Sequence, residues 1–163
     1  MVLFTITDVN PEHVFQNGIK TKITTRKETK LLQQLKTAAL AAQKNAHAPY
    51  SKFRVGAAII ANDGQVYSGC NVENAAYPLG QCAEASAIGA MVTQGATQIQ
   101  QIIVVSPNDE YCYPCGGCRQ KIAEFAGAET PVIMMTNQGQ CTTTTVAELL
   151  PHAYVFPLDE EQD

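Results

Sequence analysis

Three cysteines stand where two helices are predicted to begin, and together they can hold a metal ion. Cys82 opens one apolar helical segment, while Cys115 and Cys118 open another directly after Pro114. Residues three apart lie on one face of a helix, so Cys115 and Cys118 can point at the same ion. The positive end of a helix dipole also lowers the pKa of a cysteine placed there. Three thiolates and an open fourth position are typical of a catalytic zinc site.

Glu84 lies two residues after the first of these cysteines, beside the open position of the expected site. A zinc ion lowers the pKa of a water molecule that it binds, and a neighbouring carboxylate can take the proton, which is the machinery of hydrolysis. The chain contains C-x-E, then 29 residues (85–113), then P-C-x-x-C. This order is the three-cysteine form of the signature of zinc nucleobase deaminases.

A closed structural zinc site is the alternative interpretation of the same cysteines. Cys112 precedes Cys115 by three residues and could join Cys82 as a fourth ligand. Pro114 disfavours this arrangement, because it separates Cys112 from the helical turn that presents the other two thiols. The remaining cysteines and the histidines have no ligand spacing, and we expect packing or surface roles for Cys70, Cys141, His13, His47 and His152.

Apolar periodicity and turn residues predict the elements that position these side chains. Helices and buried strands alternate along the chain, which indicates one α/β domain with a central sheet flanked by helices. The predicted helices cover about residues 25–45, 82–93, 114–127 and 145–150, and the predicted strands cover 55–61, 65–72, 102–105, 132–135 and 141–144.

Local signals support these boundaries. Capping-box patterns at residues 25–28 and 145–148 predict the starts of the first and last helices. The sequence Asn-Asp-Gly at 62–64 predicts a hairpin turn between the first two strands. Gly95 is placed to follow the end of the second helix, and Pro114 is predicted to occupy the first helical position of the third.

Together these motifs closely resemble the cytidine deaminase family, in its small, homotetrameric, three-cysteine branch. The resemblance covers about residues 30–157. It implies a three-layer α/β/α sandwich around a five-stranded mixed sheet, and hydrolytic removal of the 4-amino group of cytidine and deoxycytidine in pyrimidine salvage. The segments that carry the resemblance are PYSKFRVGAA (49–58), GCNVENA (69–75), CAE (82–84), PCGGCRQ (114–120) and ELLP (148–151).

The family's site residues carry over by position. The resemblance implies that one Zn²⁺ per chain is held by Cys82, Cys115 and Cys118, and that Glu84 shuttles protons between water and the substrate. Glu84 would take a proton as the nucleophile attacks C4, pass it to ring N3, and then protonate the leaving amine. These roles agree with the chemistry read from the residues alone.

A second group of residues matches the positions that hold the nucleoside. The resemblance implies that Asn71 and Glu73 bind the ribose hydroxyls, and that Phe53 packs on the base or the sugar. An amide with a donor and an acceptor, beside a carboxylate with acceptors, suits vicinal hydroxyls. The backbone of Ala83 and of Cys115 would contact the pyrimidine.

One residue departs from the family pattern close to the metal. The family usually has an arginine directly after the catalytic glutamate, where it donates to the ligand thiolates, and this chain has Ala85. Three thiolates give Zn²⁺ a net charge of −1, which a nearby cation offsets. Either Arg54 or Arg119 takes over this role, or the helix dipoles do more. The change also leaves room for an altered substrate range. Gly117, where alanine is common, is a smaller departure.

The resemblance further implies a homotetramer whose sites are completed by neighbouring chains. Tyr154 stands where the family usually places a phenylalanine that reaches a neighbour's site. Charged residues make up 16% of the chain, against about 25% in an average globular protein, which suits a partly covered surface. The helix over 82–93 has an apolar face that would pack against another subunit, or against the chain's own sheet. It consists of the small residues Ala83, Ala87 and Ala90 beside Ile88 and Met91.

Charge and hydropathy exclude several function classes. The chain carries 11 basic and 15 acidic residues, which argues against binding a phosphate backbone. It has no apolar run of the ~20 residues that span a bilayer, and its first residues do not follow the pattern of a signal peptide. We expect a cytoplasmic protein with a catalytic domain over 29–163 behind an extension over 1–28, and with no nucleic-acid or membrane partner.

Three other functions remain open at this stage. The first is deamination of a modified cytosine nucleoside, either substituted at the 4-amino group or of the antibiotic type, which the Ala85 departure permits. The second is a polynucleotide deaminase, which the negative net charge disfavours. The third is an inactive, zinc-stabilised assembly protein, but a purely structural site would have no need for the carboxylate of Glu84.

Overall fold

The computed structural model describes residues 26–156 of the chain, and the side chains of residues 30–156. Helices and strands alternate in it as the sequence predicts. In chain order they are α1 (Arg26–Lys44), β1 (Gly56–Ala61), β2 (Val66–Cys70), the short 3-10 helix η1 (Tyr77–Leu79), α2 (Ala83–Thr93), β3 (Ile99–Val105), α3 (Gly116–Phe125), β4 (Pro131–Met135), β5 (Cys141–Thr145) and α4 (Val146–Leu149).

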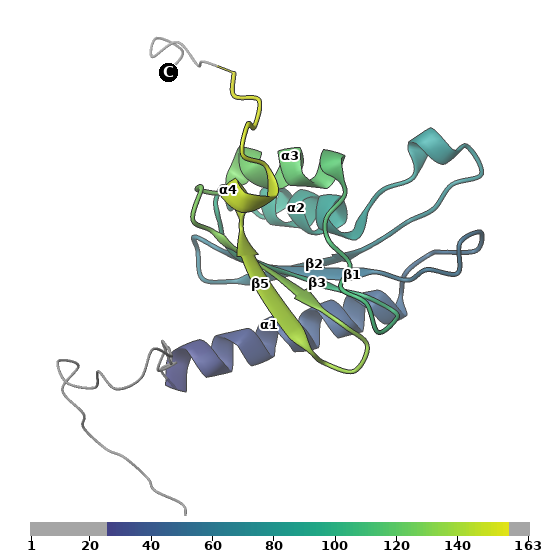
Figure 1. Cartoon of the computed structure of the whole chain (residues 1–163), viewed down its shortest axis with the longest axis horizontal. Coiled ribbons are helices and arrows are strands. Elements are labelled where there is room, and N and C mark those ends of the chain that lie inside the picture. Colours follow the sequence, from purple (N-terminus) through teal and green to yellow (C-terminus); the bar gives the residue numbers. More distant parts are fainter. Residues whose placement is uncertain (1–25, 157–163) are drawn as a thin grey trace, which may run out of the picture.

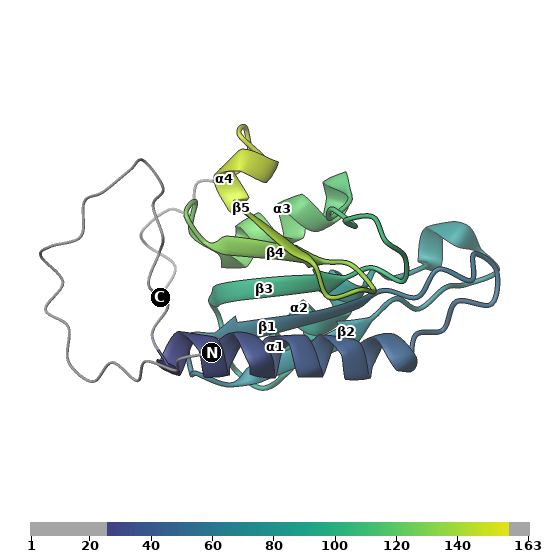
Figure 2. The same cartoon turned by 60° about the horizontal axis from the view of Figure 1, so that its bottom comes forward.

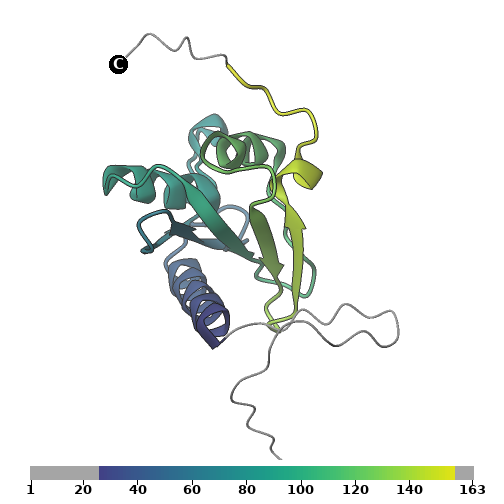
Figure 3. The same ribbon diagram turned by 90° about the vertical axis from the view of Figure 1, so that its left-hand side faces the viewer.

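The five strands form one mixed sheet in the order β2-β1-β3-β4-β5. Strands β3 and β4 are parallel, and the other neighbours are antiparallel. Helix α1 lies on one face of the sheet, while α2 and α3 lie on the other, as Figures 1 and 2 show. Turned on its side, the molecule shows the same three layers (Figure 3). The predicted three-layer α/β/α sandwich with five strands is confirmed.

Strand β1 is buried on both faces because helices cover both sides of the sheet. Successive side chains of a strand point to opposite faces. Ala57 and Ile59 therefore belong to the core beneath α2 and α3, while Ala58 and Ile60 pack against α1, where Leu35 is fully buried. This arrangement explains why the strand reads as a continuous run of apolar residues.

Two glycines let the helices approach the sheet closely. A Cβ atom on Gly56 would lie 2.1 Å from the carbonyl oxygen of Ala39 in α1, and one on Gly69 would lie 2.3 Å from the backbone nitrogen of Ala87 in α2. Real Cβ atoms essentially never come this close to another heavy atom. These positions therefore require glycine, and they hold α1 and the metal-site helix α2 against β1 and β2.

Turn and cap predictions can be compared with the structure residue by residue. Strands β1 and β2 form the expected hairpin, and Gly64 and Gly95 adopt the positive φ values of 77° and 89° that their roles need. Thr145 and Glu148 form the predicted reciprocal capping box. The first predicted capping box, and most of the predicted extension over 1–28, lie outside the described residues.

Three expectations are wrong. Strand β3 begins at Ile99 rather than at 102, because the strand continues through two polar residues at its edge. Pro114 is not the first helical residue of α3. Cys115 is extended (φ −64°, ψ 165°) and serves as the N-cap, so helical geometry starts at Gly116. The 3-10 helix η1 was not predicted.

The apolar face of α2 packs inside this chain, and not against another subunit as expected. Ala83, Ala87, Ile88 and Met91 are buried in the core of this chain, against its own sheet. The alternative that the sequence left open, packing within one chain, is therefore correct for them. No helix within residues 26–156 is both long enough and apolar enough to cross a membrane.

Candidate active site

The three predicted metal ligands converge where α2 and α3 begin. Cys82 is the N-cap of α2, Cys115 is the N-cap of α3, and Cys118 lies in the first turn of α3. All three Sγ atoms lie within 4.8 Å of one another. The Sγ atoms of Cys82 and Cys115 are 3.9 Å apart. Two helix dipoles thus direct their positive ends at one cluster of sulfur atoms.

The donor set fits zinc. Tetrahedral zinc with Zn–S bonds of about 2.3 Å places its sulfur ligands roughly 3.8 Å apart, close to the separation found between Cys82 and Cys115. Cys118 is buried, while Cys82 and Cys115 are exposed, so the cluster opens toward solvent on one side. Cys112 is not a member of the cluster that the described residues form. This geometry favours three protein ligands and an open position over a closed four-cysteine site.

The thiols of the cluster influence one another. A hydrogen bond from Cys118 lowers the pKa of Cys82 to about 6. The same bond, with burial and the nearby acidic groups, raises the pKa of Cys118 well above its usual value. Cys82 therefore loses its proton more readily than Cys118. Binding of a divalent cation would displace the protons that remain.

Glu84 is buried beside this cluster, with an exposed fraction of only 4%. It lies in the first turn of α2, two residues after the N-cap. Burial raises the pKa of this carboxyl group above its usual value, although a hydrogen bond with Cys118 and the charge of Lys121 oppose the shift. General acid–base catalysis is most efficient when the pKa of the group lies near the operating pH, and a rise above the usual carboxyl value goes in that direction.

Both arginines that could compensate for Ala85 donate hydrogen bonds to backbone carbonyl groups. Arg119 donates from Nε to the carbonyl of Pro114 (2.8 Å) and from Nη1 to the carbonyl of Leu149 (2.9 Å), so it ties the start of α3 to the end of α4. Arg54 donates to the carbonyl of Lys44 at the end of α1 (3.0 Å).

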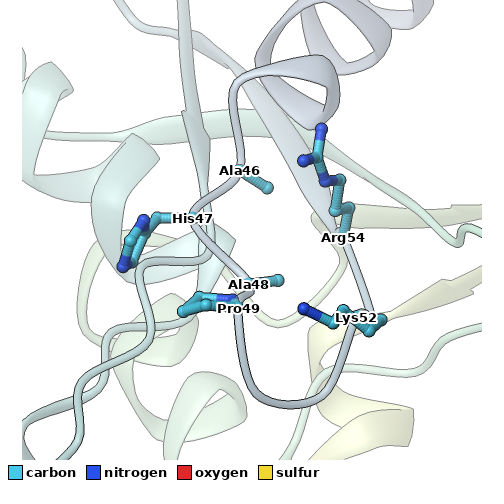
Figure 4. Close-up of a pocket in the computed structure, with 6 residues that line it drawn as sticks. All are labelled: Ala46, His47, Ala48, Pro49, Lys52 and Arg54. Atoms are coloured by element: carbon cyan, nitrogen blue, oxygen red, sulfur yellow. The ribbon is translucent and has the colours of Figure 1, made fainter.

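Figure 4 shows the surroundings of Arg54. Together with Lys52 and residues 46–49 it lines a pocket of about 230 Å³, and the cysteines are not part of this lining. The pocket therefore lies apart from the metal cluster. Arg54 serves the loop and the end of α1 rather than the thiolates.

Lys121 supplies positive charge near the site, and the sequence analysis missed it. It follows Cys118 by three residues in α3, so both lie on the same side of the helix. Its charge lowers the pKa of Cys82 and of Glu84. The i, i+3 spacing from a predicted ligand was the signal in the sequence that could have identified it.

Asn71 and Glu73 lie directly after β2, in a segment that connects to the metal cluster. Val72, between them, exchanges two backbone hydrogen bonds with Gln81 (2.8 and 2.9 Å), the residue before Cys82. The residues predicted to bind the sugar are thereby fixed next to the start of α2. The hydroxyl of Ser51, above all, and the backbone N–H groups of the same loop hold the pKa of Glu73 below its usual range.

The other predicted contacts have different degrees of exposure. Phe53 is partly open to solvent, with an exposed fraction of 37%, whereas the side chain of Ala83 is buried at the first helical position of α2. Tyr154 is 70% exposed. The side chain of Gln120 holds its backbone, donating to the Tyr154 carbonyl (2.8 Å) and accepting from its N–H (3.1 Å). The segment around Tyr154 is thus fixed at α3 while its ring points away from the chain's own core.

Comparison with known proteins gives a consistent result. Residues 29–135 match the family described as the cytidine and deoxycytidylate deaminase zinc-binding region. A cytidine deaminase from Sporosarcina psychrophila is 45% identical over 113 residues, which cover 69% of this chain and 83% of that protein. The crystal structure of a cytidine deaminase from Burkholderia pseudomallei superposes with a TM-score of 0.71 at 41% identity, over 75% of this chain and 98% of that one.

A relative with a different name is also similar. A blasticidin-S deaminase from Bacillus cereus is 32% identical over 112 residues, which cover 64% of this chain and 79% of that protein. The chain is therefore less similar to the blasticidin-S deaminase than to the Sporosarcina enzyme.

Proposed function

The chain belongs to the cytidine deaminase family of zinc enzymes, and we propose that it hydrolyses cytidine and deoxycytidine to uridine and deoxyuridine with release of ammonia. The observation that carries this proposal is the placement of a buried carboxylate, Glu84, beside three converging cysteines at two helix N-termini. A purely structural metal site would not need a carboxylate whose pKa is raised by burial.

The chain's own residues account for the proton transfers. Cys82, Cys115 and Cys118 would hold Zn²⁺, which when bound acts as a Lewis acid and lowers the pKa of water. Glu84 takes the proton of the attacking water and delivers it to ring N3 of the pyrimidine as C4 becomes tetrahedral. The carboxylate then takes the proton of the new C4 hydroxyl group and passes it to the 4-amino group, which leaves as ammonia while C4 becomes a carbonyl. Its buried position keeps bulk water from competing for the proton.

Recognition of the nucleoside falls to the neighbouring segments. Asn71 and Glu73 offer hydrogen-bonding groups to the sugar, and the ring of Phe53 offers an apolar surface to the base or the sugar. The backbone groups of Ala83 and Cys115 lie at the two helix starts, where they can pair with the polar edge of the pyrimidine. These assignments are supported by the way Val72 and Gln81 join the two segments.

The proposal includes assembly into a homotetramer and a role in cytoplasmic pyrimidine salvage. Exposed apolar side chains around η1 and the C-terminal segment support the assembly, because they would be covered by neighbouring chains. They are Tyr50, Val72, Tyr77, Leu79, Tyr154, Val155 and Phe156. All six cysteines are free, which suits a reducing compartment.

Deamination of a modified cytosine nucleoside is the second candidate function. Two observations favour it: Ala85 in place of the usual arginine, and the similarity to a blasticidin-S deaminase. Asn71 and Glu73, whose side chains suit the hydroxyl groups of an ordinary ribose, favour cytidine instead, so cytidine is the first candidate substrate.

An absorbance assay distinguishes the two. The zinc-loaded protein is given cytidine, deoxycytidine, free cytosine, blasticidin S and a 4-amino-substituted cytidine at equal concentrations, and loss of ultraviolet absorbance is followed. We expect cytidine and deoxycytidine to have the highest kcat/KM. A kcat/KM for blasticidin S or the substituted nucleoside above that for cytidine would replace the proposal by the second candidate, and no turnover of any of the five would contradict both.

A further inference from the structure

The side chain of Asn71 is paired with the loop that carries Phe53. Its Oδ1 accepts from the backbone N–H of Val55 (2.8 Å), and its Nδ2 donates to the carbonyl of Phe53 (2.9 Å). The amide thus pairs with a backbone donor and a backbone acceptor, as a neighbouring strand residue would. Asn71 therefore fixes the position of the loop on which the aromatic ring of Phe53 stands.

Glu73 holds the other end of the same loop. Its Oε2 accepts from the N–H of Tyr50 (2.9 Å) and of Ser51 (3.2 Å), and its Oε1 accepts from the hydroxyl of Ser51. The Ser51 hydroxyl also accepts from the N–H of Phe53 (2.9 Å). One hydroxyl group thus connects the carboxylate of Glu73 to the backbone of Phe53.

The loop needs these contacts to keep its shape. Lys52, between Ser51 and Phe53, has a φ of 60°, in the left-handed region that residues other than glycine seldom adopt. Figure 4 shows the tight path of the chain from Ala46 to Arg54. A conformation of this kind persists where neighbouring contacts determine it, and the hydrogen bonds of Ser51 flank it on both sides.

The remaining hydrogen-bonding capacity of the two residues matches a hydroxyl group. A carboxylate has about four acceptor sites, and an amide side chain has two donors and two acceptor sites. Within the described part of the chain, three contacts at Glu73 and two at Asn71 leave one acceptor site on the carboxylate, and one N–H and one acceptor site on the amide. A sugar hydroxyl could donate to Glu73 and accept from the free N–H of Asn71.

We infer that Ser51 is a positioning residue for the sugar of the nucleoside: its hydroxyl holds the carboxylate of Glu73 and the loop of Phe53 in one fixed relation. The inference rests on the proposed function, and it adds a residue that does not itself need to touch the substrate. Without the Ser51 hydroxyl, Glu73 would lose one of the three hydrogen bonds that orient its carboxylate. The N–H of Phe53 would lose its partner, and only the carbonyl of Phe53 would stay anchored. The nucleoside should then bind more weakly, while the proton transfers at Glu84 continue.

The test is Ser51→Ala, with Ser51→Thr as the variant that keeps the hydroxyl. We expect Ser51→Ala to raise KM for cytidine about tenfold, the effect of one hydrogen bond to a charged group, and to change kcat less than threefold. Ligand-observed NMR should show the same tenfold rise in the Kd of the product uridine, with the Kd of sugar-free uracil unchanged. Ser51→Thr should restore both values to within about threefold of the wild type.

Ser68→Ala is the matched control, because Ser68 is exposed in β2 away from this loop. It should leave KM, kcat and both Kd values at wild-type levels. An unchanged KM and uridine Kd in Ser51→Ala would overturn the inference, as would an equal weakening of uridine and uracil. A wild-type protein that binds uridine but does not deaminate cytidine would contradict the proposed function alone, since the uridine-to-uracil comparison would still decide the role of Ser51.

Discussion

Cys82, Cys118 and Glu84 influence one another's charge states, because each is a cause of a pKa shift in at least one of the others. Cys118 lowers the pKa of Cys82 and also hydrogen-bonds Glu84, while burial raises the pKa of the carboxyl group. A cation would balance this concentration of negative groups, and Lys121 provides further positive charge from the next turn of α3. The chemistry of the site therefore depends on the cluster rather than on any one side chain.

Replacing single cysteines by serine tests the ligand set. Cys82→Ser, Cys115→Ser and Cys118→Ser should each reduce bound zinc to well below one ion per chain, because an open site has only three protein ligands. Cys112→Ser should retain the wild-type zinc content, and it is the matched control because it removes a nearby thiol outside the cluster. Elemental analysis of the purified variants gives the answer. If Cys112→Ser loses as much zinc as Cys115→Ser, the site is a closed four-cysteine one.

At the scale of the elements, the site depends on how closely α2 sits on the sheet. Cys82 and Glu84 are at the start of α2, and this helix packs over Gly69 of β2. A side chain at Gly69 would push the helix outward and displace the start of α2, where Cys82 and Glu84 lie. The backbone fit of one glycine is therefore linked to the geometry of the metal cluster.

Gly69→Ala should destabilise the fold. The added Cβ would lie 2.3 Å from the backbone nitrogen of Ala87, and such overpacking typically costs about 1–3 kcal/mol. Thermal unfolding should show Tm lowered by several degrees. Gly89→Ala is the control, since an added Cβ at this position of α2 meets no atom of the described residues within 4 Å, and alanine should raise stability by about 0.8–1 kcal/mol. A Tm for Gly69→Ala equal to or above that of the wild type would contradict the close approach.

Most helices and strands could be predicted, because local sequence patterns indicate where they begin and end. The Asn-Asp-Gly turn, the Thr145 capping box and the glycine after α2 each follow from a backbone requirement of a few residues. The start of β3 could not be predicted, because Gln101 pairs with β1 through its backbone and Gln100 lies at an irregularity in that pairing, and neither side chain indicates a strand. The N-cap role of Cys115 depends on a single ψ angle, which the sequence Pro-Cys-Gly-Gly does not determine.

Part of the site could also be predicted from local sequence patterns. Ligand spacing and the C-x-E pattern identify Cys82 and Glu84, since these residues are close in the chain to the helix start that orients them. The sequence could not show that the hydroxyl of Ser51 meets Glu73, 22 residues away, because this contact depends on the pairing of two separate segments. The same holds for Gln120 and Tyr154, which are 34 residues apart.

At the scale of the whole molecule, the most exposed large apolar side chains of the described residues lie outside α2. Tyr77 and Leu79 of η1 are more than two-thirds exposed, and so are Val155 and Phe156 near the end of the described chain. Gln120 fixes the backbone of Tyr154 to α3, so Val155 and Phe156 directly follow an anchored residue. A surface of this kind suits contact with further copies of the chain.

Light scattering at micromolar concentration tests the proposed assembly. A homotetramer should give about 70 kDa, four times the chain mass of 17.6 kDa. Leu79→Lys, which places a charge on the exposed apolar surface, should shift the mass toward smaller species, whereas Gln65→Lys on the exposed β1–β2 turn should not. A wild-type protein that is monomeric and fully active would contradict both the tetramer and a role for Tyr154 in a neighbour's site.

The most direct test of the account is the rate of cytidine deamination by Glu84→Gln, measured together with its zinc content. Glutamine has nearly the same size and hydrogen-bonding reach as glutamate but cannot carry the protons. The account predicts one zinc ion per chain, an unchanged Tm, and a kcat for cytidine lowered at least 10²–10⁴-fold, the usual contribution of general acid–base catalysis. A zinc-loaded Glu84→Gln protein that deaminates cytidine within tenfold of the wild-type rate would contradict it.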